Sequence, residues 1–198
     1  MTLRAWVPAS ETKPAPMPLL VVQSFVNTRE VDMETDLLLD DELTARAWLT
    51  DAGLLDPGVL EIDLTETRAL RENIRTLLVH NGSGPSPPAA GLGAMERIAE
   101  RCRFRPGVDA TGRVQLDPAA DRALAPAARL LLIIRDAQRD GTWQRLKACR
   151  NDECQWAFYD RSHAARGAWC DMAVCGNRMK NRSLRSRRAG AGKDTSRG

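Results

Sequence analysis

The sequence predicts a mainly α-helical protein with a small β-hairpin, an α+β fold in which a helical N-terminal domain precedes a compact C-terminal module. Three observations lead to this prediction. Residues 64–80 repeat apolar side chains at helical spacing, and residues 119–141 form a strongly apolar helical stretch. Four cysteines then gather in the last quarter of the chain, in the pattern C-x4-C, fifteen residues, C-x4-C.

Composition places the chain among globular proteins. It has 198 residues, of which 43% are hydrophobic and 28% are charged. It contains no run of about 18 apolar residues of the kind that a membrane span needs. Prolines and an acid interrupt the N-terminus, which therefore lacks the layout of a signal peptide. We expect a cytoplasmic protein without membrane contact, in which clustered cysteines favour metal or redox roles over disulfides.

The net charge of +3 conceals an uneven distribution. Residues 1–141 carry 16 Lys and Arg against 21 Asp and Glu, a net of −5. Residues 142–198 carry 13 against 5, a net of +8. A basic module attached to an acidic body indicates that nucleic acid would meet the C-terminal part and not the body.

The first 55 residues predict a lead followed by short elements. Residues 1–17 contain three prolines and little periodicity, which indicates a flexible lead. Residues 18–30 begin apolar and β-branched, a pattern compatible with either a short strand or a buried helical turn. Asp40 or Asp41 is placed to cap a helix over residues 42–55. The apolar positions of that helix include Leu43, Ala47 and Leu54.

The clearest helix covers residues 64–80. Asp63 and Glu66 have the spacing of a capping box at its start. One face of the helix carries its large apolar side chains, namely Leu70, Ile74, Leu77 and Leu78. Glycine, serine and proline over residues 81–88 predict a loop after it.

Two further helices enclose a hairpin. Residues 89–102 predict a helix weakened by glycines, and residues 103–117 predict a β-hairpin around a Gly/Asp/Thr turn. The helix over residues 119–141 has Pro126 in an early turn. The final residues, 189–198, are small and polar, and we expect a disordered tail there.

The cysteine pattern predicts a structural zinc site. Structural zinc takes four protein ligands in a tetrahedron, and two short-spaced cysteine pairs joined by a loop meet that need. The expected ligands of the single ion are Cys149, Cys154, Cys170 and Cys175. Four unrelated buried thiols, a redox dithiol and an iron–sulfur cluster are the alternatives, although a redox pair prefers C-x-x-C. His163 is an alternative ligand in the connecting loop, and Cys102 reads as a core residue.

Several stretches resemble two families that occur together in bacterial proteins. "CRNDECQWAFYDRS" and "WCDMAVCGNRMK" resemble the CGNR-type zinc finger, whose name repeats residues 175–178. "SFVNT", "WLTDAGLL" and "ALRENIRTLL" resemble the ABATE domain that accompanies this finger. The resemblance implies a treble-clef finger over residues 142–188 with the four cysteines as ligands. It also implies an ABATE-like, ligand-sensing domain over residues 18–141 and a stress-related transcription regulator.

A basic helix after the last cysteine is the predicted nucleic-acid contact. When residues 176–188 are drawn as a helix, six polar side chains share an arc of about 140°. These are Asn177, Arg178, Asn181, Arg182, Arg185 and Arg188, and Lys180 adds charge from the far side. Arginine and asparagine bind phosphates and read base edges. A solvated basic tail is the simpler alternative, and Asn177 and Arg178 are also placed to bond backbone around the thiolates.

Gly167 and Ala168 stand where the finger family commonly has two arginines. We therefore expect fewer basic contacts from the loop before the second cysteine pair.

Two functions from different classes fit these observations. The first is a ligand- or stress-responsive transcription regulator that binds DNA through the finger, and the alternative is a zinc-finger adaptor between proteins. Asn27, Arg71 and Arg75 are candidate contacts for an unknown small-molecule ligand, although satisfied polar groups and surface ion pairs explain such residues more simply. An enzyme is the least favoured, because no catalytic set stands out among a chain with two histidines. A homodimer is compatible with the sequence.

Overall fold

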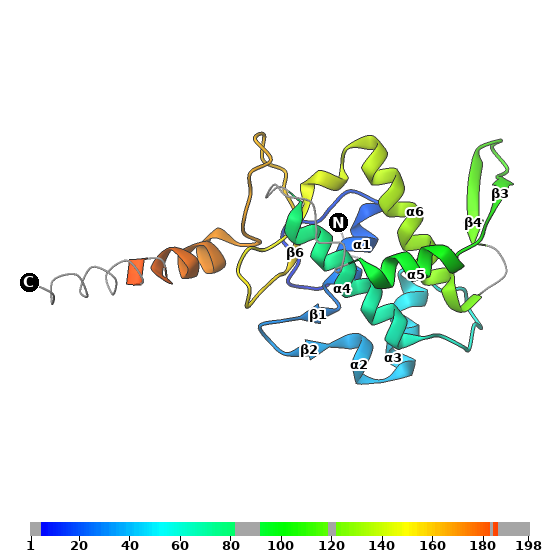
Figure 1. The fold of residues 1–198 in the computed structure, drawn as a ribbon, viewed down its shortest axis with the longest axis horizontal. Coiled ribbons are helices and arrows are strands. Elements are labelled where there is room, and N and C mark those ends of the chain that lie inside the picture. The colour runs from blue at the N-terminus through cyan, green and yellow to red at the C-terminus, as the bar shows by residue number, and fades with distance from the viewer. Residues whose placement is uncertain (1–4, 82–91, 119–121, 183, 186–198) are drawn as a thin grey trace, which may run out of the picture.

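The computed structural model describes residues 5–81, 92–118, 122–182 and 184–185. Within these ranges the protein is mainly helical and has three two-stranded antiparallel sheets, which confirms the predicted fold class (Figure 1). The helices are α1 (Leu19–Val26), α2 (Leu37–Asp40), α3 (Glu42–Asp51), α4 (Leu64–His80), α5 (Gly93–Arg101) and α6 (Ala125–Asp140). The strands are β1 (Arg29–Glu30), β2 (Thr35–Asp36), β3 (Phe104–Val108), β4 (Val114–Pro118), β5 (Leu146–Ala148) and β6 (Ala157–Tyr159). Short helical turns are η2 (Arg122–Leu124), η3 (Trp143–Arg145) and η4 (Met172–Gly176).

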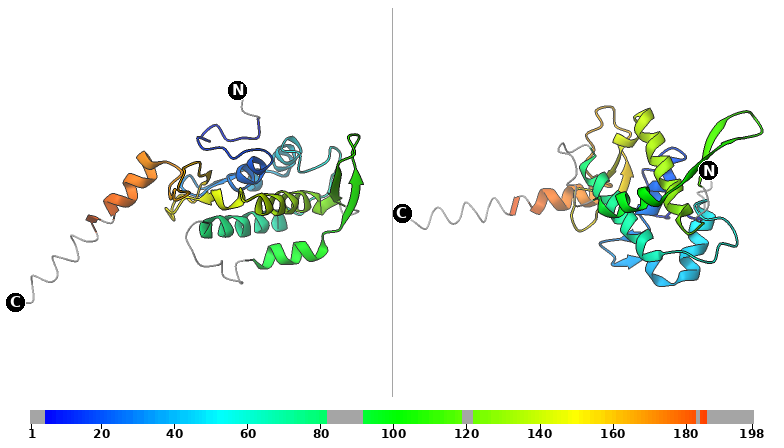
Figure 2. Two further views of the ribbon diagram at one scale, coloured as in Figure 1. Left: turned by 90° about the horizontal axis from the view of Figure 1, so that it is seen from above. Right: turned by 45° about the vertical axis from the view of Figure 1, so that its right-hand side comes forward.

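The first helix, α1, is buried on nearly every side. All of its residues except Leu20 are buried, and it packs against α4, α6 and β6. Figure 2 shows α4 and α6 running side by side next to it. The sequence left open whether this segment is a strand or a helix, because a segment that is apolar all round has no diagnostic period.

Helix α3 begins where the sequence predicts but faces another way. Asp41 caps it, because the Asp41 carboxylate accepts hydrogen bonds from the backbone N–H groups of Leu43 and Thr44. The expected apolar positions Leu43 and Ala47 are exposed, and Leu43 is 75% exposed. The helix instead buries Ala45, Trp48 and Leu49. Since the Trp48 indole is the largest apolar group on the helix, its burial decides which face turns inward.

Helix α4 has the predicted face and half of the predicted cap. The Asp63 carboxylate accepts a hydrogen bond of 2.8 Å from the Glu66 N–H. The Glu66 side chain does not close the capping box, because it forms an ion pair with Arg101 of α5. Leu70, Ile74 and Leu78 are fully buried against the core.

The segment before α1 packs on the body, in contrast to the expected flexible lead. Trp6, Val7 and Ala15 are buried in the core. The Ala15 N–H donates a 2.7 Å hydrogen bond to the Gln23 side chain of α1. Its prolines disrupt any regular periodicity in the sequence. Buried apolar side chains and hydrogen bonds of its backbone nevertheless hold this segment against the body. The rest of the lead (1–4), most of the predicted loop (82–88) and the predicted tail (189–198) lie outside the described residues.

The core does not end where the sequence places the domain boundary, near residue 141. Trp143, Leu146, Ala148, Ala157 and Tyr159 belong to the same cluster of buried side chains as α1 and α4. Strand β5 packs against α4, and β6 packs against α1. The hairpin that carries the first cysteine pair is therefore part of the body.

The β3–β4 hairpin extends from the body at the end opposite the C-terminal helix (Figures 1 and 2). Its register pairs Phe104 with Pro118, Pro106 with Leu116 and Val108 with Val114. Because alternate residues of a strand share one face, these six apolar side chains lie together. Val108 and Val114 are 70% and 73% exposed.

None of the helices in the described part of the chain has the length and apolar character to cross a membrane.

We predict that truncating Leu146 destabilises the body and not only the finger. Leu146 is fully buried, so Leu146→Ala should lower the free energy of unfolding by about 2–5 kcal/mol. Chemical denaturation, combined with hydrogen exchange at the amides of α4, measures this effect. Leu184→Ala is the control, because Leu184 is 40% exposed and its loss should cost less than about 0.5 kcal/mol. Unchanged exchange in α4 of Leu146→Ala would show that the two parts have separate cores.

Candidate metal centre and basic helix

The first cysteine pair lies on a tight turn between β5 and β6. Cys149 directly follows β5, and its N–H donates to the Trp156 carbonyl at 2.9 Å. The carbonyl of Asn151 accepts hydrogen bonds from the N–H groups of Cys154 and Gln155, at 2.8 and 3.0 Å. Gln155 has a φ of 49°, which lets the chain turn back into β6. This turn directs both sulfurs toward the same point.

The second pair is positioned by the short turn η4. Asp171 caps the turn, because its carboxylate accepts from the N–H groups of Ala173 and Val174. The N–H groups of Cys175 and Gly176 donate to the Asp171 carbonyl, at 3.0 and 3.1 Å. Cys170 thus precedes the turn and Cys175 lies within it, so backbone bonds set the separation of their sulfurs.

The four sulfurs form one compact group. The Sγ atoms of Cys149, Cys154, Cys170 and Cys175 all lie within 4.8 Å of one another. Cys154 and Cys170 are 3.6 Å apart at sulfur, and Cys170 and Cys175 are 3.8 Å apart. Zinc–sulfur bonds of about 2.3 Å in a tetrahedron require sulfurs about 3.8 Å apart. The donor set and its spacing therefore fit one zinc ion.

The thiols compete for protons when no cation balances their charge. Hydrogen bonds from the Cys154 and Cys170 thiols lower the pKa of Cys149 to about 2. The same bond with Cys149 raises the pKa of Cys154 to about 12, and bonds to Cys149 and Cys154 also raise the pKa of Cys170. One thiolate in the group thus opposes the ionisation of the others, and a divalent cation removes that opposition.

Asn151 supports the group, although the sequence did not single it out. Its side chain is fully buried, and its amide nitrogen lies 3.9 Å from the Cys175 sulfur. It therefore links the first cysteine turn to a ligand of the second pair. A short polar residue two positions after a ligand was the available signal, but that signal also fits an exposed turn.

His163 and Cys102, which the sequence analysis also considered, lie outside this group of cysteines. No histidine is among the clustered ligands of the described residues, so His163 does not replace a cysteine there. Cys102 is buried in the main core, as predicted.

A buried ion pair organises the loop between the two cysteine pairs. Lys147 Nζ lies 2.8 Å from Asp160 Oδ2, and both side chains are almost fully buried. Burial raises the pKa of Asp160, but hydrogen bonds from Lys147, Ser162 and Gly167 outweigh it and hold the pKa below its usual range. A Cβ on Gly167 would lie 2.9 Å from the Asp160 carboxyl group. Glycine at this position lets the backbone approach a buried charge that a side chain would displace.

The basic helix begins directly after η4. Residues 177–182 and 184–185 are helical and extend away from the body (Figure 1). Of the predicted nucleic-acid contacts, those described are all exposed, namely Asn177, Arg178, Lys180, Asn181, Arg182 and Arg185, while Arg188 lies outside the described residues. The Asn177 amide donates to the Ala173 carbonyl at 3.0 Å. Arg182 forms an ion pair with Glu153 of the first cysteine turn.

The candidate ligand contacts of the N-terminal domain have their hydrogen bonds inside the protein. Arg71 is buried and binds the Asp36 carboxylate through two bonds of 2.6 Å. Arg75 donates to the carbonyls of Gln155 and Val26, at 2.9 and 2.8 Å. Asn27 pairs with the backbone of Ala157 in both directions.

Fold and site together define a zinc-finger protein whose metal centre is held by four cysteines. Family models agree with this class and extend it. Residues 145–188 match the CGNR zinc finger, and residues 21–139 match ABATE, described as "Putative stress-induced transcription regulator". The second match covers more than half of the chain, so the chain belongs to the ABATE family. No match was found among the curated proteins.

We predict one zinc ion per chain, removable by a single ligand change. Cys175→Ser should lose the ion and disorder residues 169–182, because metal binding supplies much of the folding free energy of a small zinc module. The β5–β6 hairpin should persist, since it belongs to the main core. Elemental analysis and hydrogen exchange measure the two effects. Cys102→Ser is the control that keeps its zinc, and isolated protein containing iron or no metal would contradict the assignment.

Proposed function

We propose that this protein is a ligand- or stress-responsive transcription regulator that binds DNA through the helix after its zinc centre. The observation that carries the proposal is a set of exposed cations on a helix that begins within the metal site. They are Arg178, Lys180, Arg182 and Arg185. The family description as a transcription regulator supports the same conclusion.

The metal gives this helix a defined orientation. Cys175 lies in η4, and the helix continues from η4 without an intervening loop. A cation set on a rigid support loses less conformational freedom on binding than one on a free tail. This attachment favours a DNA contact over a solvated basic tail.

Charge also favours the helix as the contact. Residues 1–141 have a net charge of −5, so DNA phosphates would be repelled by the body. The helix extends away from that body, which keeps its cations clear of the acidic surface (Figure 2).

An adaptor between proteins is the second candidate, and one observation favours it. Met172 and Val174 of η4 are 61% and 53% exposed. Met33, in the turn between β1 and β2, borders the same groove as Val174 and is also exposed. Exposed apolar side chains beside a finger suit a protein contact.

We predict DNA binding that weakens steeply with salt. If three or four arginines meet phosphates, log K should fall against log salt with a slope of about −3 to −4. Arg182→Gln combined with Arg185→Gln should flatten this slope by about two units and weaken all duplex sequences alike. Fluorescence anisotropy with random and genomic duplexes measures the slope. Arg97→Gln with Arg139→Gln is the matched control, because both are exposed cations of the body.

The ion pair between Glu153 and Arg182 supplies a second test, in which a substitution should strengthen DNA binding. Glu153 neutralises Arg182 in the free protein. Glu153→Gln should therefore strengthen DNA binding while zinc content stays at one ion. Binding that is undetectable, or independent of salt, would exclude the regulator and favour the adaptor.

We also propose that the chain forms a homodimer through the apolar face of the β3–β4 hairpin. A lone two-stranded hairpin is marginal in water, so this face gains by being covered. Pro106 and Pro118 lack N–H groups, which disfavours addition of a strand at the edges and leaves face-to-face packing of two equal surfaces. Sedimentation should give a dimer for the wild type and a monomer for Val108→Asp. Gln115→Glu, on the other face, should remain dimeric, and a monomeric wild type would contradict the proposal.

A further inference from the structure

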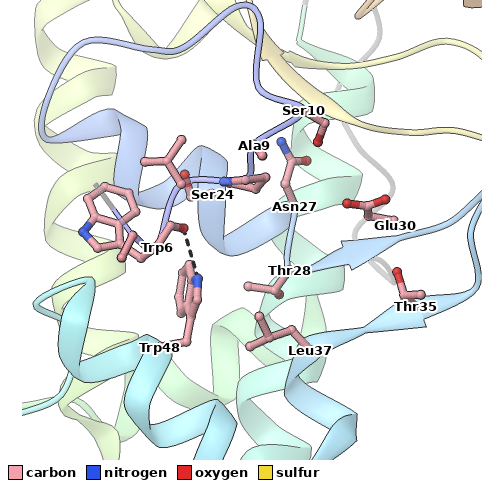
Figure 3. Close-up of a pocket in the computed structure, with 13 residues that line it drawn as sticks. Trp6, Ala9, Ser10, Ser24, Asn27, Thr28, Glu30, Thr35, Leu37 and Trp48 are labelled. Carbon is pink, nitrogen blue, oxygen red and sulfur yellow. Dashed lines mark hydrogen bonds between the residues drawn. The ribbon is translucent and has the colours of Figure 1, made fainter. Parts of the chain in front are cut away.

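A cavity lies between the N-terminal segment, α1, the β1–β2 hairpin and α3 (Figure 3). Its volume is about 630 Å³, which is within the range of small-molecule sites in proteins. Trp6 and Trp48 form its apolar end, and the Trp48 indole N–H donates to the Trp6 carbonyl at 3.1 Å. This bond fixes the Trp48 indole against the backbone of the N-terminal segment.

Ser24 lies on the wall of this cavity with an unsatisfied hydroxyl. The side chain is 1% exposed, and its Oγ has no hydrogen-bond partner among the described residues. Figure 3 shows it between Trp6 and Asn27. A buried hydroxyl without a partner is unfavourable, because it has lost water without gaining another bond. A ligand donor or a water held by a ligand would satisfy it.

Some of the other polar groups of the cavity have hydrogen-bond partners within the protein, and others have none among the residues described. The Asn27 amide is taken by Ala157, and the Thr28 hydroxyl donates to Phe25 and accepts from Arg71. Ser10, Glu30 and Thr35 also line the cavity. Within the described part of the chain, the Glu30 carboxylate has neither an ion pair nor a hydrogen bond.

The charge of the lining selects the kind of ligand. Glu30 is the single charged residue on the cavity wall as described, and neither lysine, arginine nor histidine lines it. An anion would meet an uncompensated carboxylate there, whereas an ammonium group would pair with it and donate to nearby hydroxyls. The faces of indole rings also attract cations.

We propose that this cavity binds a small organic cation, with its ammonium group at Glu30 and its apolar body against Trp6 and Trp48. This inference builds on the ligand-responsive part of the proposed function, and it names the site and the chemical class. Asn27, Arg71 and Arg75, which the sequence suggested as ligand contacts, act as supports around the site.

The cavity also shares residues with a groove beside the metal centre. Ser10 and Glu30 line both this cavity and a second groove of about 220 Å³, whose other wall includes Cys154, Cys170 and Cys175. A cation that pairs with the Glu30 carboxylate would therefore contact a residue that also lines the groove beside the zinc finger. This arrangement gives a bound ligand a short path to the zinc centre.

Three probes that share a phenyl ring and differ in charge test the proposal on the zinc-loaded full chain. They are 2-phenylethylamine, 2-phenylethanol and 3-phenylpropionate. Their binding is measured by calorimetry and by tryptophan fluorescence. The amine should bind at least about tenfold more tightly than the alcohol, and the anion should not bind. Glu30→Gln should remove the preference for the amine. Glu61→Gln, an exposed acid away from the cavity, should behave as the wild type.

Ser24→Ala provides the second variant. It should weaken amine binding while leaving the melting temperature equal or higher, because the unsatisfied hydroxyl is gone. Equal affinity for the three probes, no binding of the amine, or an unchanged preference in Glu30→Gln would overturn the proposal. DNA binding is measured separately on the same samples. If only the cavity proposal is wrong, the protein binds DNA but not the amine. If only the regulator proposal is wrong, the protein binds the amine but not DNA.

Discussion

The attachment of the β5–β6 hairpin to α1 and α4 is the interaction on which the rest of this structure depends. The Asn27 side chain exchanges two hydrogen bonds with the backbone of Ala157, as a neighbouring strand would. Arg75 donates to the carbonyl of Gln155, the residue directly after a zinc ligand. These polar groups are buried and fully engaged, so removing either one would leave backbone groups without partners. The helical body thereby sets the position of the first half of the metal centre.

The metal completes what this attachment begins. The body places Cys149 and Cys154, and hydrogen bonds from the Arg150 N–H to the Ala168 carbonyl and from Lys13 Nζ to the Trp169 carbonyl hold the segment before Cys170 beside them. The Lys147–Asp160 pair and the Asn151 amide bring the two segments close. Zinc then fixes η4 and, through it, the direction of the basic helix. Placement of the cations therefore depends on a chain of contacts that begins in the N-terminal domain.

The same short helix serves the cavity and the finger. Ser24 of α1 lines the cavity, while Asn27, directly after α1, holds the finger hairpin. If a ligand displaced the end of α1 at Ser24, the displacement would reach the β5–β6 hairpin through Asn27, which is three residues further along the chain. Coupling of this kind would require no long pathway, because α1 and the β5–β6 hairpin belong to the same core.

The sequence by itself determined helices α3 to α6, the β3–β4 hairpin and the four metal ligands, whereas it left open whether α1 is a helix or a strand. These features depend on local spacing: the period of α4, the Asp63 and Asp41 caps, and the paired C-x4-C pattern. Only the tertiary structure decided the roles of Asn27, Arg71 and Arg75, the burial of Trp6, and the continuity of the core beyond residue 141. A buried arginine and a ligand-binding arginine look alike in a sequence, because the difference lies in partners such as Asp36 and Gln155. Those partners are brought close by folding, from positions 35 and 80 residues away in the chain.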